Sequence, residues 1–246
     1  KYNDLDGTRN DRGAYGGPGY RIFPKANQRI TFSAMESKTY GDAAFDVIVA
    51  ASSGLPVNLE IISGPATVSG RTISLTGAGA VLLRASQAGN GDWNVAPEVV
   101  QSLTVNKRML TVAAGDASRS YGGTNPAFAA TISGFVNGET REVVQGTPDL
   151  SSPALPSSPI GSYPIIASWG TLSAANYDFT FSNGTLLVTK AELVVRSLDR
   201  KRTYGTANPE LVFEMAGLLN GDVPSVVTGA PELSCTATPG SPVGSY

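Results

Sequence analysis

Tyr121-Gly-Gly-Thr-Asn-Pro126, followed by Gly134-Phe-Val-Asn-Gly138 and closed by Gly161-Ser-Tyr163, is the stretch that decides the fold, because it occurs twice. The second copy reads Tyr204-Gly-Thr-Ala-Asn-Pro209, Gly217-Leu-Leu-Asn-Gly221 and Gly244-Ser-Tyr246, about 83 residues later and without a gap. About 20 of the 43 positions from Tyr121 and Tyr204 onward are identical. Self-similarity at a fixed period indicates a tandem array of small modules.

The residues around the two copies alternate between apolar and polar in runs of four to seven, bounded by Gly, Pro, Ser and Asn. This period of two predicts half-buried strands in antiparallel sheets. The 28 glycines, 16 prolines and 15 % charged residues in 246 positions also suit short strands and tight turns. The alternating pairs include Ile30 and Phe32, Leu59 and Ile61, Leu110 and Val112, Ile165 and Ala167, Leu186 and Val188, and Leu193 and Val195.

We therefore expect an all-β chain of tandem small β-sandwiches of Ig-like architecture. The alternative is a β-grasp-like module with one short helix, because Asn137 to Val144 has the polar start and apolar end of a single helical turn, as does its counterpart from Asn220 to Val227. Asn183-Gly184, between alternating residues, predicts a hairpin with a type I′ turn. With Thr185 the same residues form a glycosylation sequon, Asn183-Gly-Thr185, which the hairpin explains structurally.

Composition shifts divide the chain into four parts. Residues 1–26 are rich in Asp, Asn, Arg and Gly and are expected to be the tail of a preceding domain or a linker. Residues 27–106, 107–190 and 191–246 are expected to be three β modules. The last of these stops at the equivalent of Tyr163, so we expect an incomplete sandwich with an exposed edge and an uncovered core. The short junctions favour a semi-rigid array of modules over a flexible string.

Histidine is absent, which excludes Ser-His-Asp, Cys-His, zinc-His and haem-His sites and makes an enzyme unexpected. We expect no cofactor. The single cysteine, Cys235, forms no intramolecular disulfide and is interpreted as a small residue in a turn-rich segment. A net charge of −2 and a pI of about 5.2 disfavour nucleic acid and anionic lipid as partners. No apolar run is long enough to insert into a membrane.

Three sets of residues remain as candidate sites. Asp4, Asp6, Asn10 and Asp11 offer oxygen ligands for calcium but lack the spacing of an EF-hand, so a solvated turn is the simpler interpretation and no metal site is predicted. Four basic residues could meet an anionic glycan or form a solvated edge; they are Arg196, Arg200, Lys201 and Arg202. Trp169, if exposed beside Tyr177, could stack on a sugar; the alternative is an aromatic that caps a small core.

These motifs resemble the MBG repeats of YGX type, which occur in tandem in very large secreted and surface-attached bacterial proteins of adhesin character. Ala174-Ala-Asn-Tyr177 and Asn183-Gly-Thr-Leu-Leu-Val188 match that family's closing strands. Residues 27–106 keep Lys38-Thr-Tyr-Gly-Asp42 and are similar to Ig-like repeats of the same kind of protein. Asp11-Arg-Gly-Ala-Tyr15 resembles the closing segment of β-helix domains.

The resemblance implies a structural spacer or stalk in an extracellular or cell-surface bacterial protein, without catalysis. Its partners are expected to be neighbouring modules of the same chain. The alternative is an adhesive module that binds a glycan or a host surface protein. The residue types of the repeated motif favour fold roles: Gly supplies positive φ, Pro fixes turns and Tyr40, Tyr121 and Tyr204 fill a thin core.

Overall fold

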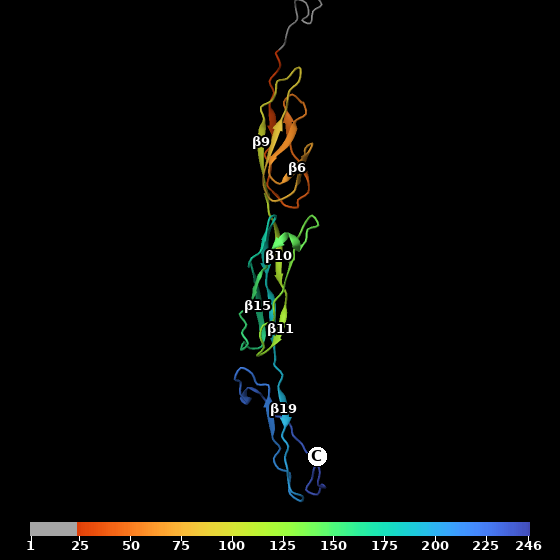
Figure 1. Cartoon of the computed structure of the whole chain (residues 1–246), viewed down its shortest axis with the longest axis vertical. Helices are drawn as coiled ribbons and strands as arrows, with labels where there is room; N and C mark the ends of the chain where they lie inside the picture. The colour runs from red at the N-terminus through yellow and green to blue at the C-terminus, as the bar shows by residue number, and fades with distance from the viewer. Residues whose placement is uncertain (1–23) are drawn as a thin grey trace, which may run out of the picture. The chain divides into compact units, whose positions relative to one another are not determined.

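The computed structural model describes residues 24–246, which are drawn in colour in Figure 1. These residues fall into two compact units. The first unit comprises the described residues up to Arg108 together with Ala175–Asp178, and the second comprises Met109–Ala174 and Phe179–Tyr246. All regular structure is β-strand apart from two single 3-10 turns in the described residues. The prediction of an all-β chain is therefore confirmed.

In the first unit, nine short strands form three sheets, of which β6 and β9 are labelled in Figure 1. The sheet orders are β2-β9-β8-β5, β3-β7-β6 and β1-β4. The strands are β1 (Ile30–Phe32), β2 (Lys38–Thr39), β3 (Phe45–Asp46), β4 (Val49–Ala51), β5 (Asn58–Ser63), β6 (Ala66–Ser69), β7 (Thr72–Leu75), β8 (Gly79–Ser86) and β9 (Val99–Asn106).

The core of this unit follows from the alternation in its two longest strands. In β8, Val81, Leu83 and Ala85 are fully buried, and Leu103 and Val105 of β9 lie on the same buried face. Successive side chains of a strand point to opposite faces, so a period of two places every second residue inside. Each buried aliphatic side chain contributes about 1.5 to 3 kcal/mol relative to exposure. Ile73 of β7 and Val49 of β4 complete the core from the facing sheets.

Residues 108–189 form a second sandwich, with sheet orders β12-β10-β17 and β11-β18-β15-β14 and a small pair β13-β16. Its core holds Leu110, Val112, Ile165, Leu186 and Val188, all predicted from alternation and all buried. The strands are β10 (Arg108–Ala114), β11 (Ala117–Ser120), β12 (Ala130–Ser133), β13 (Val144–Gln145), β14 (Asp149–Ser151), β15 (Gly161–Ser168), β16 (Ser173–Ala174), β17 (Tyr177–Ser182) and β18 (Gly184–Thr189).

The predicted hairpin at Asn183-Gly184 is wrong. β17 and β18 belong to different sheets, so the chain crosses from one layer of the sandwich to the other at Asn183. Neither residue has positive φ, which a type I′ turn requires at both central positions. Asn183 Oδ1 accepts a hydrogen bond from Ala167 N at 3.2 Å. A Cβ on Gly184 would lie 2.7 Å from the Gly115 carbonyl oxygen, so this glycine serves close backbone packing.

The expectation of antiparallel sheets needs one correction in each of the two sandwiches. β2 pairs in parallel with β9, and β11 pairs in parallel with β18. The alternation of apolar residues is the same in both strand directions, which is why the sequence pattern does not distinguish them. The remaining pairings with a printed register are antiparallel.

The β-grasp alternative is not observed in the described residues. The predicted short turns exist as the 3-10 turns η1 (Arg141–Val143) and η2 (Pro224–Val226). Neither turn contains a buried residue, so neither acts as a helix packed on a sheet. Both are single turns, and the two-layer sheet arrangement accounts for the core.

Residues 191–246 contain one sheet, formed by β19 (Val194–Ser197) and β20 (Phe213–Ala216). Leu193 and Val195, which correspond to the buried Leu110 and Val112, are exposed here. Ala237 is the buried apolar residue of this segment. The exposure follows because residues 191–246 supply no second sheet to face the first.

Candidate functional site

Trp169 lies in the turn after β15 and is 49 % exposed. The ring packs edge-on against Phe179 at 5.5 Å between centroids and lies tilted against Phe181 at 6.0 Å. Its Nε1 donates a hydrogen bond to the Leu172 carbonyl oxygen at 2.9 Å. Because the indole donor is already used, this ring offers a ligand an apolar stacking surface and no hydrogen bond.

Tyr177 occupies the start of β17 and is 1 % exposed. Its ring meets Tyr40 edge-on, with 5.6 Å between centroids and an interplanar angle of 88°. Edge-to-face packing of this kind stabilises a core beyond its buried area, by about 0.5 to 1.5 kcal/mol. The rings of Trp169 and Tyr177 thus have different aromatic partners, and Trp169 is the one that presents surface to solvent.

An open groove of about 380 Å³ lies beside the sandwich formed by residues 108–189. Arg141 is its charged lining residue, and its guanidinium donates to the carbonyl oxygens of Val144 and Gly146. The Arg141 guanidinium therefore holds the backbone of its own loop. The other lining residues are Phe128, Ala130, Ile132, Thr147, Pro148 and Leu150.

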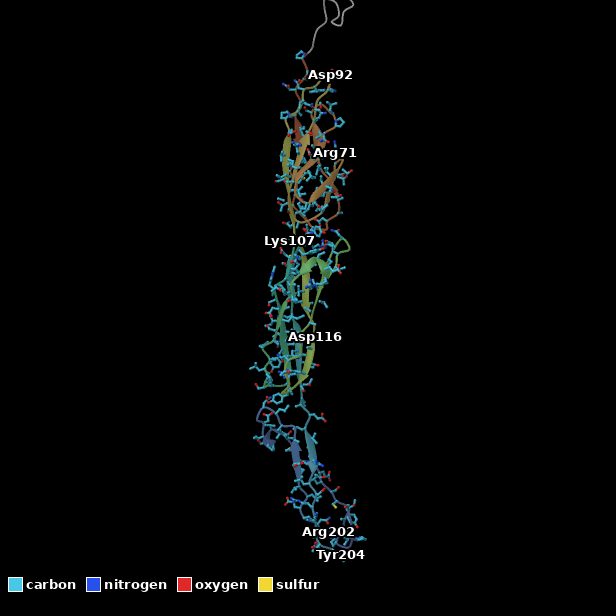
Figure 2. All side chains as sticks on the ribbon, viewed as in Figure 1. Arg71, Asp92, Lys107, Asp116, Arg202 and Tyr204 are labelled. Carbon is cyan, nitrogen blue, oxygen red and sulfur yellow. The ribbon has the colours of Figure 1, made fainter. Side chains whose placement is uncertain are left out.

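Of the four basic residues before Tyr204, one donates hydrogen bonds to the backbone and three are exposed to solvent. Arg202, which is labelled in Figure 2, donates to the carbonyl oxygens of Thr206 and Thr238. Arg196, Arg200 and Lys201 are exposed. In the preceding repeat, the equivalent residue Arg119 is buried and donates to the Leu155 carbonyl and to Asn125 Oδ1. The equivalence of these two arginines indicates a structural role for Arg202.

Arg119 and Asn125 form a polar pair inside the repeat, and the local sequence pattern did not predict their contact. Asn125 Nδ2 donates to the Ala154 carbonyl at 2.8 Å, and its counterpart Asn208 donates to Ala237 at 2.7 Å. Each pair ties the Tyr-Gly turn to the loop before the closing Gly-Ser-Tyr. The recurrence of both residues at the repeat distance was the signal that could have identified them.

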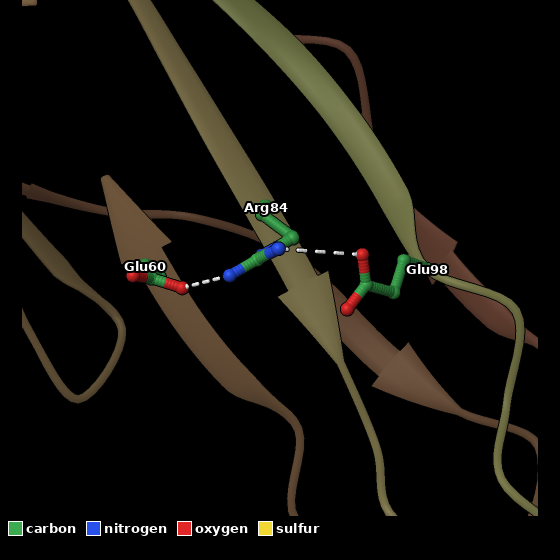
Figure 3. Close-up of polar contacts among 3 residues, drawn as sticks. All are labelled: Glu60, Arg84 and Glu98. Atoms are coloured by element: carbon green, nitrogen blue, oxygen red, sulfur yellow. Dashed lines mark hydrogen bonds and ion pairs between the residues drawn. The ribbon is translucent and has the colours of Figure 1, made fainter. Parts of the chain in front are cut away.

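The sandwich of the first unit carries an ion-pair row on its surface (Figure 3). The Arg84 guanidinium lies 2.5 Å from a Glu60 oxygen and 3.6 Å from a Glu98 oxygen. The hydrogen bond that Arg84 donates to Glu60, the negative charge of Glu60 and then the charge of Glu98 raise the pKa of Arg84 above its ordinary value. One arginine on an exposed strand face pairs with both carboxylates, so the three residues together keep one net negative charge.

In residues 24–246, no group of three or more His, Cys, Asp or Glu side chains is placed to hold a metal ion. The calcium candidates Asp4, Asp6, Asn10 and Asp11 lie outside the described residues. Cys235 is exposed and has a free thiol, and it lies outside any strand, as predicted. Within the described part, the helical turns are too short to cross a membrane.

Two solved structures show limited similarity to the chain. The Drosophila N-cadherin fragment EC1-4 has 12 % identity and a TM-score of 0.23, over 76 % of this chain and 59 % of that chain. The N-terminal eight Ig domains of the Down syndrome cell adhesion molecule have 14 % identity and a TM-score of 0.22, over 80 % of this chain and 33 % of that chain. The chain therefore spans about three fifths of the first solved chain and one third of the second.

Among curated proteins, none matches the chain. The family model described as the MBG domain (YGX type) matches residues 110–187 and 193–246, which together make up more than half of the chain. The two matched segments coincide with the two copies of the Tyr-Gly motif and with the paired Arg119 and Arg202 described above. The chain belongs to the family of MBG domains of YGX type.

Proposed function

We propose that this chain is a run of spacer repeats in a large secreted or cell-surface bacterial protein of adhesin type. The observation that carries the proposal is that the residues shared by the two repeats serve turns and packing. Gly122 and Gly205 have φ of 81° and 82°, and Asn137 and Asn220 have φ of 56° and 55°. A repeat that keeps its turn chemistry keeps its length and register, which is what a spacer requires.

The same proposal takes residues 27–106 as an Ig-like repeat of this class of protein. It also takes residues 107–190 and 191–246 as successive MBG repeats. The role needs no catalysis, and its partners are the neighbouring repeats of the chain. The extracellular location follows from the kind of protein in which such repeats occur.

Small-angle X-ray scattering of the whole chain tests the spacer proposal. A compact globule of 246 residues would have a radius of gyration of about 18 Å. We expect a clearly larger value, because an array of modules with short junctions is extended. A radius of gyration near the globular value would contradict a spacer role.

A second candidate function is glycan binding, and the half-exposed ring of Trp169 favours it. A glycan array probed with the full chain should then give a signal that Trp169→Ala abolishes. Tyr204→Ala is the matched control, because Tyr204 is an exposed aromatic elsewhere in the array. Circular dichroism establishes that both variants fold. An array without signal, or equal loss in both variants, would rule this function out.

A further inference from the structure

The Tyr-Gly turn has the same geometry in both MBG repeats. Gly122 N donates to the Pro156 carbonyl oxygen at 3.1 Å, and Gly205 N donates to the equivalent Pro239 oxygen at 3.2 Å. Both glycines have φ near 80°. Each repeat therefore carries one such turn, held against the loop that precedes its Gly-Ser-Tyr segment.

The Gly-x-x-Asn-Gly loop is also the same in both repeats. Asn220 and Gly221 have φ of 55° and 80°, and Asp222 N donates to the Leu219 carbonyl at 2.9 Å. In the preceding repeat, the equivalent bond joins Glu139 N to the Val136 carbonyl at 3.0 Å. Positive φ at both central residues with this hydrogen bond is the pattern of a type I′ turn. The loop is thus a preformed projection.

Within the second unit, the loop of one repeat meets the turn of the other. A Cβ added to Gly122 would lie 2.5 Å from Leu219 Cδ1 and 3.0 Å from Leu219 Cβ, so the leucine lies directly against the glycine. Asn220 Nδ2 donates to the Pro156 carbonyl oxygen at 3.3 Å. That one oxygen therefore accepts from Gly122 of its own repeat and from Asn220 of the next.

The turn at Gly205 provides the internal comparison. No atom lies within 4 Å of a Cβ built on Gly205, although its φ and its bond to Pro239 match those at Gly122. The close approach at Gly122 is therefore no consequence of the turn itself. It arises from the loop of the following repeat.

We propose that the Tyr-Gly turn and the Gly-x-x-Asn-Gly loop are a socket and a plug that couple consecutive MBG repeats. Socket means Gly122 with the Pro156 carbonyl, and plug means Leu219 with Asn220. The socket needs glycine for two reasons: its φ is positive, and a larger residue would fill the place of Leu219. The carbonyl oxygen of Pro156 has two lone pairs and can accept both donors.

This inference goes beyond the spacer role, because coupling of repeats would hold equally in an array that binds a ligand. It also gives the repeated motif a role outside its own module. The partner that fits the socket is the Gly-x-x-Asn-Gly loop of another MBG repeat. The preformed type I′ turn lowers the conformational entropy lost on docking.

Double electron–electron resonance on the full chain tests the coupling. Spin labels are placed on exposed strand positions at Ser151→Cys in β14 and Glu214→Cys in β20, in a Cys235→Ser background. We expect a narrow distance distribution in this parent chain and a broad one in Leu219→Asp, because a carboxylate cannot replace the apolar contact at Gly122. Asn220→Asp, which removes the Nδ2 donor and tolerates positive φ, should also broaden it.

Leu198→Asp is the matched control, because Leu198 is 40 % exposed and Leu219 is 39 % exposed in the same segment. It should leave the distribution narrow. Gly122→Ala and Gly205→Ala form a second matched pair with the same φ strain, and Gly122→Ala alone should broaden the distribution. Circular dichroism and Trp169 fluorescence verify folding. A broad distribution in the parent, or equal effects within either matched pair, would overturn the proposal while leaving the scattering test of the spacer role intact.

Discussion

Tyr40, Tyr121 and Tyr204 occupy the same place in three copies of one motif, yet their surroundings differ. Tyr40 is 4 % exposed and packs on Tyr177, Tyr121 is half-buried, and Tyr204 is 64 % exposed. The prediction that these tyrosines fill a core is therefore confirmed for Tyr40 and wrong for Tyr204. Burial depends on what the rest of the chain places around the ring, and residues 191–246 provide no facing sheet.

This difference makes a prediction about stability. Tyr40→Ala should lower the free energy of unfolding of the first unit by about 3 to 5 kcal/mol, because it removes a large ring from a packed core. Tyr204→Ala should change stability by less than about 0.5 kcal/mol, because the ring is exposed. Urea unfolding followed by circular dichroism measures both. Similar losses in the two variants would contradict the burial observed here.

At the scale of elements, the passage from β17 to β18 shows how a short motif acquires its role from packing. Asn-Gly between alternating residues favours a hairpin locally. The strands on either side, β17 and β18, nevertheless belong to the two different sheets of the sandwich. Two of the clearest type I′ turns lie at Asn137-Gly138 and Asn220-Gly221 instead. Turn propensity therefore identifies Asn-Gly as a possible type I′ pair, and tertiary packing determines which Asn-Gly pairs of the chain adopt that turn.

Gly184→Ala tests the packing role of this glycine. Its Cβ would lie 2.7 Å and 2.8 Å from the carbonyl oxygens of Gly115 and Ala114, so the β17–β18 crossing has to shift. We expect a loss of about 1 to 3 kcal/mol in the free energy of unfolding. Urea unfolding followed by Trp169 fluorescence in a Trp93→Phe background measures this free energy. Gly115→Ala is the control, because its nearest contact would be an ordinary 3.4 Å. An unchanged free energy of unfolding in Gly184→Ala would show that the backbone at Gly115 has room for a methyl group.

The ion pairs of Arg84 on β8 with Glu60 on β5 and with Glu98, just before β9, yield a pH prediction. Because the pKa of Arg84 is raised in the folded state, its contribution to stability is present at all pH values below its ordinary pKa and is lost only as the pH rises through the raised value. Titration of Arg84 should therefore leave stability flat between about pH 6 and 9.

Replacing this arginine should have a small effect that depends on salt. Its guanidinium is solvent-exposed, so Arg84→Gln should lower the urea midpoint slightly in dilute buffer and hardly at all in about 1 M salt, where charges are screened beyond about 3 Å. Unfolding at two salt concentrations measures the difference. A large loss that persists in high salt would show that packing of the arginine stem, rather than charge, stabilises the sheet.

At the scale of the whole molecule, the chain has two compact units, and one tryptophan lies in each. We expect the urea midpoint reported by Trp93 in the Trp169→Phe variant to differ from the midpoint reported by Trp169 in the Trp93→Phe variant. Compact units that pack most of their own contacts unfold as separate cooperative units. Coincident transitions from both probes would show that the two units unfold as one.

The sequence alone determined the kind of molecule: period-two alternation predicted the buried residues of β10 and β18, and the 83-residue repeat identified the MBG modules. Alternation suffices because the side chains of a strand point to opposite faces whatever it pairs with. Tertiary structure alone decided four features: the direction of β11, the crossing between sheets at Asn183, the burial of Arg119 and the exposure of Tyr204. These features depend on contacts between residues far apart in sequence, and no local pattern encodes them.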